Sequence, residues 1–138
     1  MQFENASERE APLREVYDFL HRAGPCFLAV ADGGQPHLRP IGSVRLFRDR
    51  LYFQTVRKKA VSRELHANPR VELCAVRGSE WLRLNGSAAL DDDPAARAAM
   101  PGLEALYNPD GADTELWYLR NCTAALYNGA EMVKSWRF

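Results

Sequence analysis

The stretch LAVADGGQPHLRPIGSV, residues 28–44, decides how the rest of the chain is interpreted. Apolar residues lead into Gly33 and Gly34, and a second extended run follows, which predicts a β-hairpin. The returning strand contains Pro36 and Pro40, and proline cannot donate a hydrogen bond to a β-ladder. We therefore expect this strand at the edge of a sheet, at a bulge, or where something other than a strand approaches its backbone.

Two further residues of the returning strand are compatible with a ligand. Glycine within a strand lets another molecule approach the backbone, and Gly42 follows Arg39, whose guanidinium group suits phosphate. The plain alternative is an irregular edge strand with a solvated arginine. His37 would also suit haem or proton transfer, but a lone histidine on an edge strand is expected to be merely exposed.

Outward from the hairpin, strand patterns alternate with short helical ones. Apolar residues at helical spacing follow Pro12, and Gly24 with Pro25 ends this first helix. Strand patterns cover residues 26–31, 35–47, 51–56, 71–77, 80–90 and 114–129, helical patterns cover 58–69 and 91–100, and 131–138 form a tail. We expect the first three strands to form an antiparallel meander. The pattern as a whole favours a mainly β fold, an antiparallel six-stranded barrel with short flanking helices.

Composition excludes several classes of protein. The 138 residues suit a single domain over 1–138. The 18 basic and 18 acidic side chains give a formal net charge of zero, so no overall charge attracts the protein to nucleic acid or membranes. No apolar stretch is long enough to cross a bilayer, and the polar start does not resemble a signal peptide. The cysteines form no C-x-x-C pair, so we expect them to be small core residues of a protein in the reducing cytoplasm. The cysteines and histidines show no spacing typical of a metal site, so we expect no bound metal.

A second unusual feature is the pair Lys58 and Lys59 at the start of a helical pattern. Cations are unfavourable at the positive end of the helix dipole, by up to about 1 kcal/mol each before screening. The helix after Asp91 shows the ordinary choice, because acidic residues precede Pro94. A bound phosphate would explain the lysines, and a solvated basic turn is the alternative.

The expected meander brings these features together around one ligand. Gln54 and Thr55 lie between Arg39 and the lysines, and Trp81 and Tyr127 are aromatic residues of later strands. A phosphate group beside a flat aromatic surface is typical of a nucleotide or a flavin.

The order of these segments resembles that of the FMN-binding split-barrel proteins related to pyridoxamine 5′-phosphate oxidase. The resemblance is carried by the RP strand, the T..KKA turn into a helix, NPRVEL and a W-L-R-x-x-G-x-A strand, and it covers nearly the whole chain. It implies a split β-barrel that forms a homodimer, with FMN bound at the subunit interface. The resemblance implies the following cofactor-binding residues: Arg39, Pro40, Ile41, Gly42, Ser43, Gln54, Thr55, Lys58, Lys59, Trp81 and Tyr127.

In that resemblance, Arg39 and the two lysines correspond to phosphate-side positions, and Pro40 to Ser43 lie along the ring edge. Trp81 and Tyr127 are equally compatible with core or interface aromatics. The chain is shorter than the vitamin B6 oxidases and lacks an identifiable substrate set for pyridoxal phosphate. We therefore expect an FMN-dependent oxidoreductase acting on an unidentified small molecule, with a flavin-storage protein or an F420-dependent reductase as alternatives; no catalytic residue is assigned.

Overall fold

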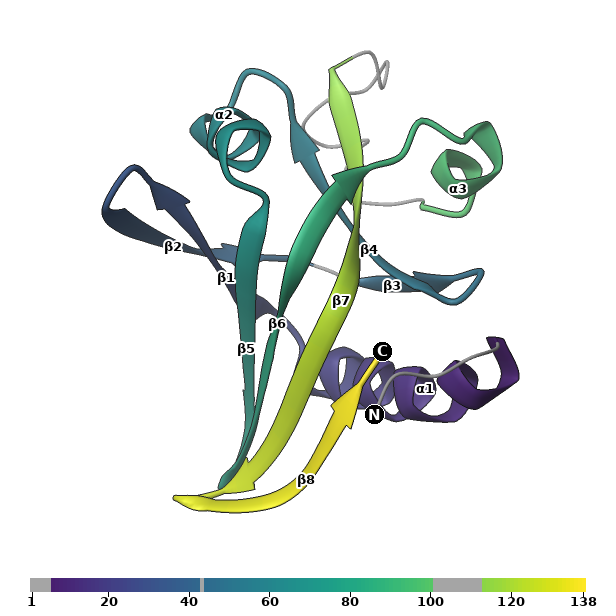
Figure 1. Cartoon of the computed structure of the whole chain (residues 1–138), viewed down its shortest axis with the longest axis vertical. Helices are drawn as coiled ribbons and strands as arrows, with labels where there is room; N and C mark the ends of the chain where they lie inside the picture. The colour runs from purple at the N-terminus through teal and green to yellow at the C-terminus, as the bar shows by residue number, and fades with distance from the viewer. Residues whose placement is uncertain (1–5, 43, 101–112) are drawn as a thin grey trace.

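The structure is a computed structural model that describes residues 6–42, 44–100 and 113–138 (Figure 1). Its strands are β1 (Cys26–Asp32), β2 (Gln35–Ile41), β3 (Arg45–Phe47), β4 (Arg50–Val56), β5 (Arg70–Arg77), β6 (Glu80–Leu90), β7 (Thr114–Asn128) and β8 (Glu131–Arg137). The helices are α1 (Ala6–Ala23), α2 (Ala60–Ala67) and α3 (Pro94–Ala98). Every strand pair is antiparallel, so the mainly β antiparallel fold expected from the sequence is confirmed.

The strands form one curved sheet that is open at one seam. Its order is β2-β1-β5-β6-β7-β4-β3, and β8 pairs with β7. Among the described strands, β2 pairs only with β1, and the half of β4 after Tyr52 pairs only with β7. The free edges of β2 and β4 therefore border the split in the barrel. An edge position explains why β2 tolerates Pro36 and Pro40, as the sequence predicted.

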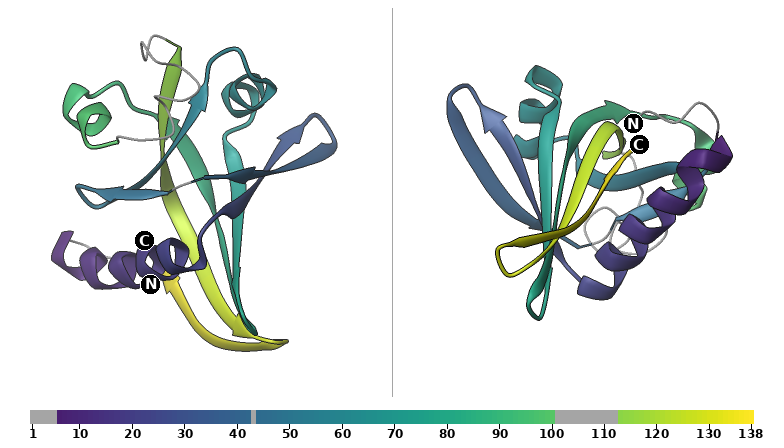
Figure 2. Two further views of the ribbon diagram at one scale, coloured as in Figure 1. Left: turned by 180° about the vertical axis from the view of Figure 1, so that it is seen from behind. Right: turned by 60° about the horizontal axis from the view of Figure 1, so that its bottom comes forward.

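The core fills the concave side of this sheet. Leu28, Leu73, Leu82 and Leu84 are among its fully buried side chains. The inner face of α1 contributes Leu13, Val16 and Leu20 to the same cluster, as their helical spacing predicted. Figure 2 shows α1 along one side of the sheet, with α2 and α3 toward the other end of the molecule.

Three elements differ from the sequence expectation. The run 35–47 is two strands, β2 and β3, at opposite ends of the sheet order, so the expected three-stranded meander is wrong. The tail forms β8, because residues 123–128 of β7 extend beyond the part of β7 that pairs with β4 and offer an edge to the tail. Helix α1 begins at Ala6 rather than at Pro12, which lies inside it. A proline removes one hydrogen bond from a helix interior without necessarily ending the helix.

The three cysteines differ in their burial. Cys26 and Cys122 are buried core residues, but Cys74 is half-exposed because it lies on the outward face of β5; no disulfide joins the three. Burial raises the pKa of the Cys26 thiol to about 11, which makes it an inert core group.

No helix in the described part of the chain is long and apolar enough to span a membrane.

Candidate functional site

A cavity of about 440 Å³ lies at the split, between the free edges of β2 and β4. Its volume falls in the range of about 300–1,000 Å³ that is usual for small-molecule sites. The lining combines apolar residues from both edges with a few polar groups. It consists of Pro25, Leu28, Arg39, Pro40, Ile41, Gly42, Phe53, Gln54, Thr55, Val56, Lys59, Val61 and Thr114.

The guanidinium of Arg39 is a cationic group in the lining of the cavity. Its Nη2 donates a 3.0 Å hydrogen bond to Oε2 of Glu64 on α2. Its Nη1 is buried and has no hydrogen-bond partner in the described part of the chain. A buried cationic donor without a partner is costly, and an anion in the cavity would satisfy it.

Glu64 fixes the position of the Arg39 guanidinium. The carboxylate is buried, and its second oxygen, Oε1, accepts a 2.6 Å hydrogen bond from Nδ1 of His37. Burial alone would raise the pKa of Glu64, but the hydrogen bonds and positive charges of His37 and Arg39 outweigh burial and lower it. Glu64 is therefore an ionised anchor, and His37 is not merely the exposed edge residue that the sequence suggested.

The amino end of α2 supplies a second cationic feature. Lys59 lies at the N-cap in an extended conformation, no side chain caps the helix, and the first turn contains no acidic residue. In contrast, Asp93 caps α3 with a 3.0 Å hydrogen bond from the backbone N–H of Ala95. An anion bound beside the start of α2 would therefore complement the helix dipole.

The polar residues of β4 lie on the other wall of the cavity. Nε2 of Gln54 donates a 3.1 Å hydrogen bond to the carbonyl of Met100, which fixes the orientation of the amide. Thr55 is buried next to it. Because consecutive strand residues point to opposite faces of a sheet, the two residues border the cavity from different faces of β4.

Seven of the residues that the resemblance implied thus line one cavity: Arg39, Pro40, Ile41, Gly42, Gln54, Thr55 and Lys59. Lys58 is exposed just before α2 and is not part of the lining. Ser43 lies outside the described residues. The sequence analysis expected Arg39 and Lys59 to approach each other because β2 and β4 would be paired. In the structure these two strands do not pair, and their free edges face each other across the split.

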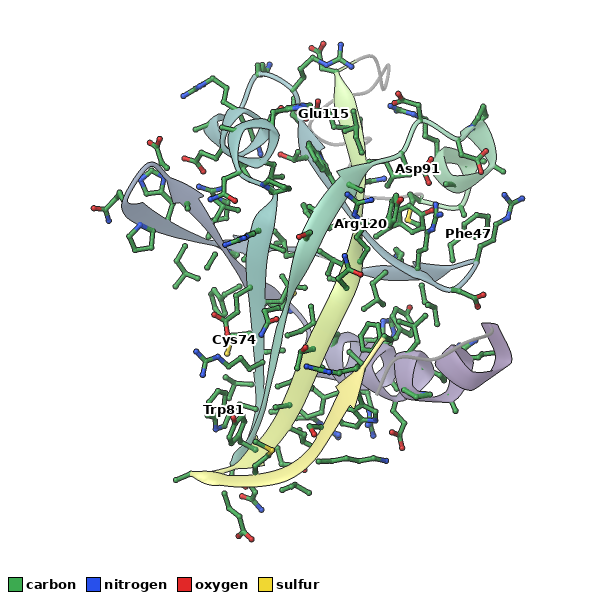
Figure 3. All side chains as sticks on the ribbon, viewed as in Figure 1. Phe47, Cys74, Trp81, Asp91, Glu115 and Arg120 are labelled. Atoms are coloured by element: carbon green, nitrogen blue, oxygen red, sulfur yellow. The ribbon has the colours of Figure 1, made fainter. Side chains whose placement is uncertain are left out.

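Trp81 and Tyr127 lie elsewhere in the molecule. Figure 3 shows Trp81 at the end of the sheet opposite to Glu115 and α2. Its ring stacks on Tyr127 with centroids 4.3 Å apart, and its Nε1 donates a 2.8 Å hydrogen bond to the carbonyl of Gly129. Within one chain, this aromatic pair does not line the cavity.

Sequence reasoning missed Glu64, the group that orients Arg39. A weak signal was present, because Glu64 is the one acidic residue in the basic segment 57–70. The other side of α2 has a similar arrangement, in which the buried Glu115 accepts hydrogen bonds from Ser62 Oγ at 2.5 Å and His66 Nε2 at 2.9 Å. Helix α2 is therefore tied to the sheet by a buried carboxylate on each side.

Comparison with known proteins decides the family. The family model described as pyridoxamine 5′-phosphate oxidase matches residues 13–117, which include both walls of the cavity and α2. The chain belongs to the pyridoxamine 5′-phosphate oxidase family. The resemblance inferred from the sequence is confirmed, and the open seam fits the split barrel of this family. No curated protein has a significantly similar sequence.

Several solved structures have the same fold. A NimC/NimA family protein from Clostridium acetobutylicum superposes with a TM-score of 0.89 at 22% identity, covering 100% of both chains. General stress protein 26 from Bacillus anthracis gives 0.76 at 14% identity, covering 92% of this chain and 98% of that one. A heme binding protein from Mycobacterium smegmatis gives 0.68 at 20% identity, covering 99% and 60%, respectively. At these identities the likeness concerns the fold alone.

Proposed function

We propose that this chain is a cytoplasmic flavoprotein that binds FMN non-covalently and acts as an oxidoreductase on a small molecule. The observation that carries the proposal is the buried Nη1 of Arg39, which has no hydrogen-bond partner among the described residues and belongs to a cavity that Lys59, at the start of α2, also lines. The lack of a disulfide among the three cysteines is consistent with a reducing compartment.

The cationic end of the cavity suits a phosphate group. Arg39 offers a charged donor, Lys59 an ammonium group, and α2 the backbone N–H groups of its first turn. A flavin with a terminal phosphate would place its dianion there. Riboflavin, which lacks the phosphate, should therefore bind much more weakly.

The apolar part of the lining suits the rest of the ligand. Ile41 and Phe53 supply apolar surface, and Gly42 leaves its backbone accessible at the free edge of the split. FMN, when bound, supplies hydride and electron transfer, while the chain orients it and limits access of water. No described side chain in the lining is an evident acid or base for the reaction, so position and electrostatics are the contributions we assign to the protein.

The proposal includes a homodimer, and an outward row of apolar side chains supports this. Val76, Trp81, Tyr127 and Met132 lie opposite one another on neighbouring strands, so they share one face of the sheet. Val76 and Met132, at the two ends of this row, are 55% and 54% exposed, which is high for large apolar residues. A second copy of the chain would bury this row, and it would bring Trp81 and Tyr127 into an interface.

The visible absorption spectrum of the protein purified without added cofactor tests the proposal. Flavin bands, together with FMN in the fraction released by heat, are the expected result. A haem or deazaflavin spectrum would assign the cavity to another ligand. A colourless protein that also fails to bind added FMN would overturn the proposal.

Oxidoreductase activity needs a separate test, because a storage protein would give the same spectrum. We expect NADH or NADPH to reduce the bound flavin, and an organic acceptor to reoxidise it faster than oxygen does. If no donor reduces the flavin at a rate above that of free FMN, the protein is a flavin carrier instead.

A further inference from the structure

A cluster of possible metal ligands lies outside the cavity, between the tip of the β1–β2 hairpin and α2. Asp32, His37 and Glu64 each offer a ligand atom, and these atoms all lie within 4.8 Å of one another. Figure 1 shows α2 next to this hairpin. No sequence spacing indicated a metal site, because the three residues come from three different elements.

The fold explains why the three side chains converge. Val30 pairs with His37, and Asp32 lies two residues farther along β1, so Asp32 and His37 share the face that is turned toward α2. Glu64 projects from α2 onto that face and reaches His37. The arrangement is thus fixed by strand register and by the packing of one helix.

The Asp32 carboxylate is the unusual member of this cluster. It is exposed, and it has no hydrogen-bond or ion-pair partner in the described part of the chain, although a histidine and a second carboxylate lie within reach. It also lines an open cavity of about 450 Å³ together with Glu64 and Asn68. An ion that entered from this cavity would have three protein ligands and room for water.

We propose that Asp32, His37 and Glu64 form a binding site for a divalent transition-metal ion of the zinc type, which lies outside the flavin cavity and shares with it only Glu64, the anchor of Arg39. Tetrahedral zinc bonds of about 2.0–2.2 Å require ligand atoms roughly 3.3–3.6 Å apart. The 2.6 Å contact between His37 and Glu64 must widen, and the exposed Asp32 must move inward, by about an ångström each. Both are side-chain rotations at the open end of a hairpin.

The surrounding charges favour zinc over calcium or magnesium. Arg39 already neutralises one oxygen of Glu64, and Arg63 lines the same cavity, so electrostatic attraction alone would hold a cation weakly. Hard cations depend on that attraction and prefer oxygen ligands only. An imidazole nitrogen with two carboxylates suits zinc and its neighbours, whose bonds to nitrogen are strong.

The other side of α2 supplies a matched control. His66 is also half-exposed and also bonds a buried carboxylate, Glu115, at 2.9 Å. In the described part of the chain, no second carboxylate joins that pair in a metal-ligand cluster. The same substitution at His37 and His66 therefore separates metal binding from a general effect of losing a histidine next to a buried glutamate.

The test is isothermal titration of the purified full-length protein with zinc chloride at neutral pH. We expect one zinc ion per chain with micromolar affinity, at least tenfold weaker binding in Asp32→Asn and in His37→Gln, and a change below twofold in His66→Gln. Asp32→Asn alters only an exposed side chain, so it keeps the test valid if His37→Gln unfolds. Absence of binding below millimolar zinc, or equal binding by wild type and Asp32→Asn, would overturn the proposal. A loss confined to His66→Gln would likewise overturn it.

Discussion

The carboxylate of Glu64 lies directly against the guanidinium of Arg39, with Oε2 and Nη2 separated by 3.0 Å. The contact joins α2 to the edge strand β2 and holds one side of the guanidinium, whose buried Nη1 has no hydrogen-bond partner among the described residues. Glu64 therefore acts on a ligand through Arg39 and is a positioning residue. The contact also belongs to a part-buried cluster with His37, and the contribution of this cluster to stability can be measured without any ligand.

Replacing Glu64 by glutamine should destabilise the fold. The variant keeps the shape but leaves the charge of Arg39 without its counter-ion, which we expect to cost about 1.5–3 kcal/mol. Urea unfolding at pH 7 measures this cost. Glu72→Gln is the matched control, because Glu72 pairs with Arg83 on the exposed face of the sheet and should change little. Equal stability of the two variants would contradict a special role for Glu64.

The stabilising effect of Glu64 should depend on pH in one direction. Its pKa is lowered in the folded protein from an ordinary value of 4.5, so its contribution is complete above that value and is lost as the pH falls through the folded pKa. The difference in unfolding free energy between wild type and Glu64→Gln should therefore shrink as the pH falls below about 4.5. A difference that persists to pH 2.5 would mean that the carboxylate charge is not responsible.

The two adjacent lysines should have unequal effects on FMN. Lys59 lines the cavity at the N-cap of α2, whereas Lys58 is exposed outside it. Lys59→Ala should weaken FMN at least tenfold, or about 1.4 kcal/mol, and leave riboflavin within twofold. Lys58→Ala should change neither ligand by more than about threefold. Fluorescence titration of the apoprotein measures all four affinities, and an equal loss of FMN and riboflavin would reject the phosphate assignment.

Gly86 should be intolerant of a side chain. A β-carbon there would lie 2.9 Å from the carbonyl oxygen of Arg120 and 3.0 Å from Sγ of Cys122, at the irregularity where the β6–β7 register shifts. Because the nearest atom belongs to the backbone, Gly86→Ala should cost about 1–3 kcal/mol. Gly34→Ala is the control, since nothing lies within 4 Å of its added carbon. Thermal unfolding that shows equal midpoints would contradict this local crowding.

A charge in the apolar row should dissociate the proposed homodimer. Met132→Glu places a carboxylate beside Tyr127 on the face that a second copy would bury. Sedimentation should give about twice the 15.6 kDa chain mass for the wild type and a shift toward monomer for the variant. Leu90→Glu makes the same change at an exposed apolar residue outside this row and should leave the mass unchanged. A wild-type monomer at micromolar concentration would contradict the interface.

Much of the cavity wall could be predicted from the sequence, because its signals are local. Pro36 and Pro40 indicate an edge strand wherever that edge lies, since a missing N–H is a property of the residue itself. The contrast between the two helix starts is also visible in the sequence. Aspartates that complement the helix dipole precede α3, whereas lysines that oppose it precede α2. These features require no knowledge of distant contacts.

The neighbours of each strand could not be predicted in the same way. Residues 35–47 look like one strand, yet β3 leaves β2 and joins β4 at the opposite end of the sheet. Periodicity reports which face of a strand is buried but not which strand lies beside it, so the wrong meander was as consistent with the pattern as the split barrel. The tail was misjudged for the same reason, because its partner is β7.

The sequence by itself determined the hairpin, the edge character of β2, the basic start of α2 and the type of fold, because turn chemistry and hydrophobic period act over a few residues. Only the tertiary structure decided that β2 and β4 face each other across a split, and that Glu64 meets Arg39 and His37 over separations of 25 and 27 residues. Those contacts depend on how the whole sheet curves and on where α2 packs against it. A buried carboxylate can stay ionised only where such packing brings it its partners.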